Sequence, residues 1–134
     1  MTKRLFCNLS VILLASVSAF AQQPIKVQIP FSFHVGQSIL PAGEYTADSN
    51  VAQGILRLRS GDYKSNVMIM SNHVQSNTTS DASKLVFHKY ADQYFLYQVW
   101  TAGSNSGREL RQSKPEMRLA ANGRRGIQAV LAQR

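Results

Sequence analysis

Residues 25–46 read IKVQIPFSFHVGQSILPAGEYT, and the chain is expected to be organised around this stretch. Apolar residues occupy every second position, and they are Ile25, Val27, Ile29, Phe31, Phe33 and Val35. Side chains on a strand point to opposite faces with a period of two, so these groups share one face. Burying each of them stabilises the fold by about 1.5–3 kcal/mol before entropy is subtracted. The stretch therefore predicts a strand that needs a hydrophobic partner from elsewhere in the chain.

Pro30 lies between these alternating positions, and proline cannot donate a hydrogen bond to a strand ladder. We therefore expect an edge position or a bulge midway along this first strand. Residues 36–38 and 41–43 are typical of turns because they combine glycine with serine or proline. A further strand is expected from Glu44 onward.

Three later segments also have strand patterns. Residues 54–60 (GILRLRS) alternate leucine with arginine, which predicts a half-buried strand. Residues 65–72 (SNVMIMSN) are apolar on both faces, which favours a central strand. Residues 84–101 contain KLVFHKY and QYFLYQVWT around a short turn, and their aromatic and β-branched content predicts a hairpin. The polar residues 71–83 are interpreted as a long loop.

After residue 107 the pattern becomes helical. Ser113 and Glu116 have the spacing of a capping box, in which the hydroxyl accepts from the Glu116 amide and the carboxylate reaches back. The helix is expected to run to about Asn122 and to end at Gly123 as a left-handed cap. A weak apolar stripe would dock it on the β domain through Met117, Ala120 and Ala121. Helical spacing also suggests a second amphipathic turn through Ile127, Val130 and Leu131.

Residues 1–21 have the features of a secretory signal. Lys3 and Arg4 precede an apolar run, and residues 19–21 form an A-x-A-type cleavage site. A buried helix or a membrane anchor is the alternative, but the run is short for a bilayer span of about 20 residues. We expect an exported protein, periplasmic or extracellular. The single cysteine, Cys7, lies in this segment, so the mature chain would be free of cysteine and disulfides.

The net charge of +8 is unevenly distributed. Residues 22–107 carry six Lys or Arg against five Asp or Glu, whereas residues 108–134 carry seven against two. The chain is therefore divided into a signal segment (1–21), a β domain (22–107) and a basic helical tail (108–134). Such a tail could be weakly attracted to an anionic surface.

Four segments together carry a family resemblance: IPFSFHVGQSILPAGEYT, LRLRS, KLVFHKYADQYFLYQVW and GREL. They resemble a family of small, uncharacterised exported proteins that is frequent in acidobacteria, over residues 27–118. The resemblance implies a small exported domain and brings no activity with it. The PAGEY turn before a strand is also similar to turns in bacterial immunoglobulin-like and prealbumin-like sandwiches.

The residues that could carry catalysis form no motif. His34, His73 and His88 have no short ligand spacing, so no metal site is expected. No G-x-S-x-G sequence is present, and no phosphate-binding glycine loop is found. The acids of the β domain lie at turns or strand ends, where they more often accept backbone hydrogen bonds: Glu44, Asp48, Asp62, Asp81 and Asp92. We therefore expect neither enzyme activity nor a cofactor.

Two groups of side chains are candidates for binding. Tyr94, Tyr97 and Trp100 in the hairpin could stack on a sugar, although hairpin aromatics usually pack across strands. Four cations could contact an anion: Arg57, Arg59, Arg124 and Arg125. The alternative for the two strand arginines is a solvated face that protects a sheet edge.

The sequence thus predicts an all-β domain, a small antiparallel β-sandwich or partly open barrel, with a short C-terminal helix. The expected role is a non-enzymatic binding or envelope-structural module that acts through protein–protein contacts. The first strand is the candidate edge for accepting a partner's strand. The alternative is a small-ligand or glycan-binding domain that uses the hairpin aromatics. An envelope protein or a glycan is the expected partner, and nucleic acid is not.

Overall fold

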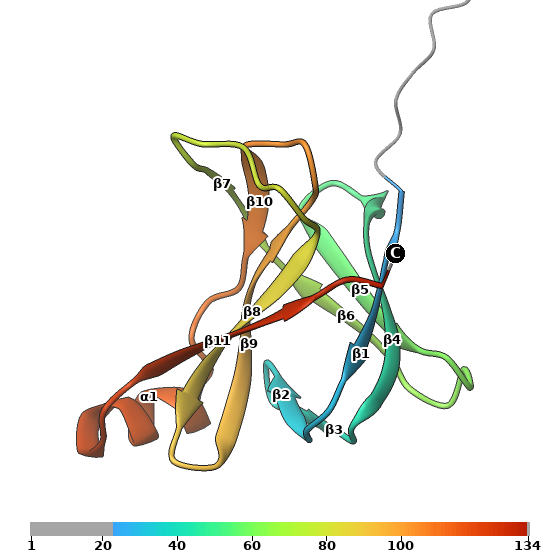
Figure 1. The fold of residues 1–134 in the computed structure, drawn as a ribbon. Coiled ribbons are helices and arrows are strands. Elements are labelled where there is room, and N and C mark those ends of the chain that lie inside the picture. The colour runs from blue at the N-terminus through green and yellow to red at the C-terminus, as the bar shows by residue number, and fades with distance from the viewer. Residues whose placement is uncertain (1–22, 134) are drawn as a thin grey trace, which may run out of the picture.

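The computed structural model describes residues 23–133. The expected signal segment, Cys7 and Arg134 lie outside these residues. Two β-sheets face each other in the described chain, and a single short helix lies outside the second sheet (Figure 1). The sheets do not close into a barrel, and the predicted all-β sandwich with a short C-terminal helix is confirmed. None of the described residues forms a helix with the length and apolarity needed to cross a bilayer.

The first sheet is antiparallel throughout and has the order β1-β4-β5-β6. Its strands are β1 (Ile25–Ile29), β4 (Gly43–Ala52), β5 (Ile55–Ser60) and β6 (Asn66–Met70). The second sheet has the order β11-β8-β9-β10-β7. Its strands are β7 (Asn72–Gln75), β8 (Lys84–Tyr90), β9 (Gln93–Trp100), β10 (Ser106–Glu109) and β11 (Gly126–Leu131). The β2 (Phe33–Val35) and β3 (Ser38–Leu40) hairpin joins this sheet through a parallel bridge from β2 to β9.

The predicted first strand is split between the two sheets. Pro30 follows the last residue of β1, and β2 begins after it in the second sheet. The expected edge position is confirmed because β1 pairs within the first sheet only with β4. The predicted apolar face is also confirmed, since five of its side chains are at most 6% exposed: Ile25, Val27, Ile29, Phe33 and Val35.

The core between the sheets is sealed by the hairpin of β8 and β9. Phe33 contacts Tyr45 of β4 and Phe87 of β8 edge to face, with ring centroids 5.0 and 5.5 Å apart. Leu56 and Leu58 of β5 are fully buried from the opposite sheet. Edge-to-face aromatic pairs add about 0.5–1.5 kcal/mol to the energy of area burial. The apolar stretch near residue 30 and the β8–β9 hairpin, which lie in opposite halves of the chain, therefore pack in one core.

The prediction that residues 65–72 form a central strand is wrong. β6 is the last strand of the first sheet, and Met68 and Met70 are 60% and 80% exposed. Apolar residues on both faces suggested burial on both faces, but nothing in the described chain covers the outer methionine face. The expected loop at 71–83 also contains β7, which pairs with β10. Its polar residues are compatible with a strand because they lie at a sheet edge.

Helix α1 (Lys114–Asn122) has the predicted start, because Ser113 Oγ accepts from the Glu116 amide at 3.3 Å. Its end differs from the prediction, since Gly123 is extended at φ −148° rather than left-handed. The expected apolar docking stripe is also wrong, because Met117, Ala120 and Ala121 are exposed. The buried residue of the helix is Glu116.

The predicted second amphipathic turn is a strand instead. Residues 126–131 form β11, which pairs with β8 along its whole length, from Gly126↔Lys89 to Leu131↔Lys84. The inter-strand hydrogen bonds of this pairing override a weak helical pattern. β10 also crosses the expected boundary at residues 107–108, so the basic segment contributes two strands to the second sheet.

Candidate functional site

The three hairpin aromatics do not form one platform. Tyr94 stacks on Phe31 with ring centroids 3.7 Å apart, whereas Tyr97 stacks on His88 at 3.8 Å. The pairing of β8 with β9 shifts between Val86 and Phe87, which leaves Tyr97 as the extra residue of a bulge. A bulge turns the following side chains to the other face, so the sequence alternation could not show which rings share a surface.

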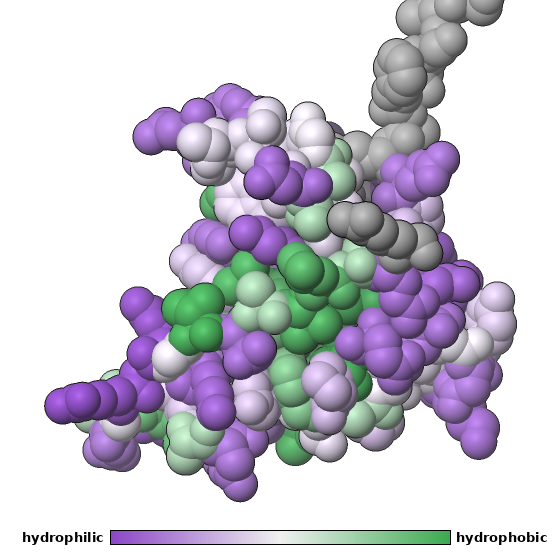
Figure 2. Space-filling view, in the orientation of Figure 1, coloured by the Kyte–Doolittle hydropathy of each residue, from purple (hydrophilic) through white to green (hydrophobic). Residues whose placement is uncertain are grey.

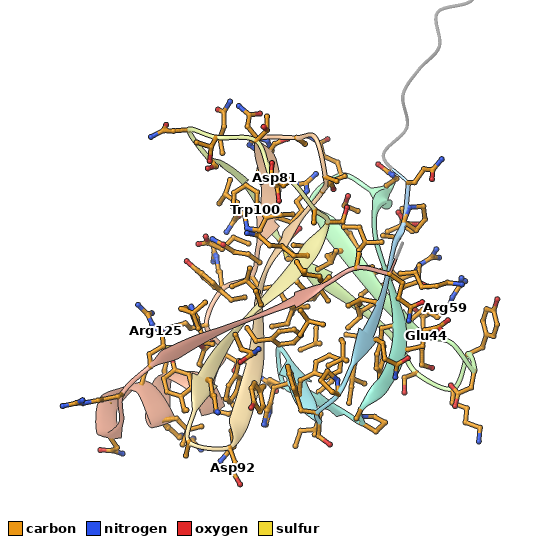
Figure 3. The ribbon with its side chains drawn as sticks, in the orientation of Figure 1. Glu44, Arg59, Asp81, Asp92, Trp100 and Arg125 are labelled. Carbon is orange, nitrogen blue, oxygen red and sulfur yellow. The ribbon has the colours of Figure 1, made fainter. Side chains whose placement is uncertain are left out.

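Trp100 is the hairpin aromatic that lines an open groove. Its Nε1 donates to Gln98 Oε1 at 3.0 Å, and Gln98 Nε2 donates to Glu109 Oε2 at 2.7 Å, which fixes the indole. The indole also lies against Gly107, where an added Cβ would come within 2.8 Å of the ring. Figure 3 places Trp100 and Asp81 close together at the upper end of the second sheet.

This groove has a volume of about 670 Å³ and lies between the outer face of the second sheet and the 76–82 loop. Its sheet side is lined by Trp100, Val86, Ile127, Ala129 and Leu131. Its loop side carries hydroxyl groups from Ser76, Thr78, Thr79 and Ser80. Figure 2 shows a hydrophobic patch on this side of the molecule with hydrophilic residues around it. The groove therefore combines one aromatic ring, aliphatic side chains and hydroxyls.

The strand arginines proposed as anion contacts are already engaged. Arg57 Nη2 lies 3.2 Å from Asp48 Oδ2, and this pair is largely shielded from solvent. The Arg59 guanidinium lies 4.6 Å from the centre of the Tyr63 ring, a cation–π contact. Arg124 and Arg125 are exposed between α1 and β11. The structure therefore does not bring the four proposed cations together.

Besides Asp48, two acids of the β domain are held in local contacts, Glu44 and Asp62. Glu44 Oε1 lies 3.7 Å from Lys26 Nζ across β1 and β4. Asp62 accepts from Ser60 Oγ at 2.6 Å and from the Lys64 amide at 3.0 Å. These hydrogen bonds, the one from Ser60 first, hold the pKa of Asp62 below its usual range. Among the described residues, no three His, Cys, Asp or Glu side chains are grouped so that they could hold a metal ion.

A buried polar cluster beneath α1 was missed by sequence reasoning. His88 Nδ1 lies 2.6 Å from Glu116 Oε1, and the same oxygen accepts from the Tyr90 hydroxyl at 3.1 Å. The side chains of His88 and Glu116 are only 2% and 5% exposed. Burial, followed by the charge of Glu116, raises the pKa of Tyr90. The capping-box spacing of Glu116 suggested a local partner, and no sequence signal indicates a contact 28 positions away.

The cluster anchors the helix to the second sheet. His88 and Glu116 are almost completely buried, so their side chains join the helix and the sheet inside the fold. A buried hydrogen bond of this kind is costly to break because the remaining polar group is left without water or a partner. We therefore regard this pair as structural.

The free side of β6 is an edge of the first sheet, and we call it the open edge. β6 pairs with β5 from Asn66↔Arg59 to Met70↔Ile55 without a register shift. Within residues 23–133 no other strand pairs with β6. β6 contains no proline, charged residue or bulge, which are the usual means of protecting a strand edge.

A hollow of about 240 Å³ lies beside the open edge, lined by Ile69, Met70, Asn72 and Arg111. Ile69 packs against the core but is only partly buried, as is Val67. The turn between β2 and β3 supports Ile69 from inside, because a Cβ on Gly36 would lie 2.8 Å from Ile69 Cδ1. Gly36 has φ +59°, a conformation that glycine adopts without strain. The open edge thus combines free backbone groups with an apolar hollow that has a cation at its rim.

Comparison of the chain with family models, with curated proteins and with solved structures found no match. The resemblance of its motifs to exported acidobacterial proteins therefore stays an expectation.

Proposed function

We propose that this protein is a non-enzymatic binding module that accepts an extended segment of a partner protein as an added strand on β6. The observation that carries the proposal is the unprotected open edge, with Met68 and Met70 exposed along it. This moves the candidate edge from β1 to β6. The signal-like residues 1–21 favour binding outside the cytoplasm, to another envelope protein.

Backbone hydrogen bonds would supply the affinity. Each new bond between the incoming strand and β6 contributes about 0.5–1.5 kcal/mol net. Side chains on one face of that strand would lie over the partly buried Val67 and Ile69 and extend the core. Those on the other face would lie beside Met68 and Met70, whose flexible thioethers adapt to varied neighbours.

The hollow supplies the specificity. Ile69 and Met70 favour an apolar side chain in it, while Arg111 at the rim favours an acidic or amide neighbour. The partner segment would therefore be extended, alternating, and would carry an apolar residue close to an acidic one. A basic segment would be disfavoured by Arg111.

Site-specific cross-linking tests the proposal. A photo-reactive amino acid at position 68 should cross-link one envelope protein in cells, and hydrogen exchange on the purified complex should show new protection of the β6 amides. The same probe at Tyr63, which is 71% exposed but not on the edge, is the matched control. Equal cross-linking from position 63, or a complex that leaves β6 exchange unchanged, would contradict the proposal.

A second candidate function is supported by the Trp100 groove: binding of a glycan by stacking on the indole. The oriented ring and the hydroxyl-rich loop are the observations in its favour. Trp100 is the only tryptophan in the chain, so its fluorescence reports directly on this groove. Glycans that bind there should shift the emission of the wild type and of Met68→Lys alike. No shift across envelope glycans would eliminate this candidate and leave the open edge untouched.

A further inference from the structure

Helix α1 presents an unusual face to solvent. The side that packs on the second sheet buries the carboxylate of Glu116, whereas Met117 is 50% exposed. Ala120 and Ala121 are exposed as well. A helix docked on a protein core normally buries its apolar residues and exposes its charges. Leu119 is half-buried, whereas Met117, Ala120 and Ala121 remain available for a contact outside this chain.

The burial of Glu116 also leaves only basic groups among the exposed charges of this segment. Its carboxylate is held by His88 and Tyr90 inside the fold and is withdrawn from the surface. Among described residues 110–133, every exposed charged side chain is basic. These side chains are Arg111, Lys114, Arg118, Arg124 and Arg125. Figure 3 places Arg125 beside the start of β11, above α1.

Cations and apolar groups share one stripe of the helix. Lys114, Met117, Arg118 and Ala121 are spaced i, i+3, i+4 and i+7, so they line the same side. We call this stripe, with Arg124 after it, the basic helix face. Ile127, which is 62% exposed, follows at the start of β11. The stripe differs from a purely ionic surface because Met117 and Ala121 lie beside the charges of Lys114 and Arg118.

We propose that the basic helix face binds the surface of an anionic lipid membrane. Lipid headgroups supply negative charge for the arginines and lysine, and the region below them accepts apolar side chains such as Met117. A soluble polyanion would use the cations but would give Met117 no role. Charge complementarity together with the exposed apolar groups therefore favours lipid.

The position of α1 leaves the open edge accessible. The helix packs outside the second sheet, while β6 is the last strand of the first sheet (Figure 1). Asp92, at the tip of the β8–β9 hairpin, is an exposed acid on the neighbouring element and would oppose binding if it faced the lipid. Membrane attachment through α1 would present β6 to a partner, although the two proposals do not depend on each other.

Vesicle flotation with the full mature chain tests this proposal. Vesicles of phosphatidylcholine in which part of the lipid is replaced by phosphatidylglycerol should bind the protein, and pure phosphatidylcholine should not. Each cation near the surface contributes about fivefold to partitioning. The double variant Arg118→Gln/Arg124→Gln should therefore bind about 25-fold more weakly. Met117→Gln should weaken the binding that persists at high salt.

The matched control is Lys64→Gln, which removes an exposed cation from the turn between β5 and β6. A loss of at most twofold with this control, against the large loss for the helix variants, supports the basic helix face. An equal loss would show attraction to net charge alone and overturn the proposal. Binding to a soluble polyanion in preference to vesicles, with Met117→Gln unaffected, would also overturn it. Circular dichroism on each variant confirms that the fold is intact.

Discussion

The two edge strands of the first sheet, β1 and β6, are both rich in apolar residues but meet opposite environments. Ile25, Val27 and Ile29 of β1 are at most 6% exposed, and the end of the chain covers part of the strand. Val27 forms a β-bridge with Ala132, and the backbone carbonyl of Lys26 accepts a hydrogen bond from the Gln133 amide at 2.9 Å. No described residue covers β6 in this way. Hydrophobic content alone therefore does not predict which edge of a sheet stays open.

Protection of the β1 edge comes from both local and distant residues. Pro30 ends the strand, Lys26 places a charge on it, and the C-terminal segment adds hydrogen bonds across it. β6 has none of these features. An edge without protection is an aggregation hazard unless it has a partner, which is why we assign the binding role to β6.

The largest difference is expected between identical truncations on the two edge strands. Ile29→Ala should lower the free energy of unfolding by about 2–5 kcal/mol, because Ile29 is fully buried and leaves a cavity. Ile69→Ala should cost only about 1 kcal/mol, because Ile69 is already partly exposed. Urea denaturation of both variants measures the difference, and equal losses would show that β6 is covered in solution.

Removing the cover of the β1 edge should lower the free energy of unfolding by less than Ile29→Ala does, but it should make the protein more prone to aggregate. Ala132→Pro removes the amide that donates to the Ser83 carbonyl at 2.8 Å and disturbs the neighbouring Gln133–Lys26 bond. We expect a loss of about 1–3 kcal/mol and new concentration-dependent light scattering from a second open edge. Gln133→Ala keeps its backbone donor and should behave like the wild type. A soluble Ala132→Pro variant of normal stability would contradict the protective role of the C-terminal segment.

The stability of the β1–β2 segment should also depend on pH through His34, whereas β6 holds no titratable residue. Burial against the Phe95 ring lowers the pKa of His34 from its usual 6.5, although a hydrogen bond with Gln93 opposes this. The unfolded chain then binds a proton more readily than the native one, so this contribution to stability is present above pH 6.5 and is lost as the pH falls through the native pKa.

Urea titrations between about pH 7 and pH 5 should therefore show a fall in stability that His34→Phe reduces, since phenylalanine keeps the stacking. The exposed His73→Gln is the control and should leave the fall unchanged. An unaltered pH dependence in His34→Phe would show that His34 is not the source.

The smallest effect on stability is expected for Met68→Lys at the open edge. Met68 is 60% exposed, so the free energy of unfolding should change by no more than about 0.5 kcal/mol. The added charge should nevertheless abolish strand addition and slow any aggregation. Ile127→Lys, on the other sheet, is the matched substitution and should leave partner binding unchanged. A Met68→Lys variant that still binds its partner would remove β6 from the site.

Local sequence patterns were sufficient to predict those features that neighbouring residues determine. The core face of the first ribbon, the β8–β9 hairpin and the Ser113 cap were predicted because neighbouring residues determine them. The site was not predictable in the same way. The two apolar faces of β6 suggested a central strand, whereas the strand lies at a sheet edge. The bulge at Tyr97 interrupts the alternation between Tyr94 and Trp100, so the sequence pattern could not show which faces these rings occupy.

Short-range sequence patterns are enough to predict the β-strands, most of the turns and the buried face of the first ribbon. Period-two alternation and turn residues act over a few positions, so they can be read directly. Three outcomes are visible only in the folded chain: β6 ends its sheet, residues 126–131 pair with β8, and Glu116 is buried against His88. Those outcomes depend on backbone hydrogen bonds and contacts between distant residues, whose partners no local pattern specifies.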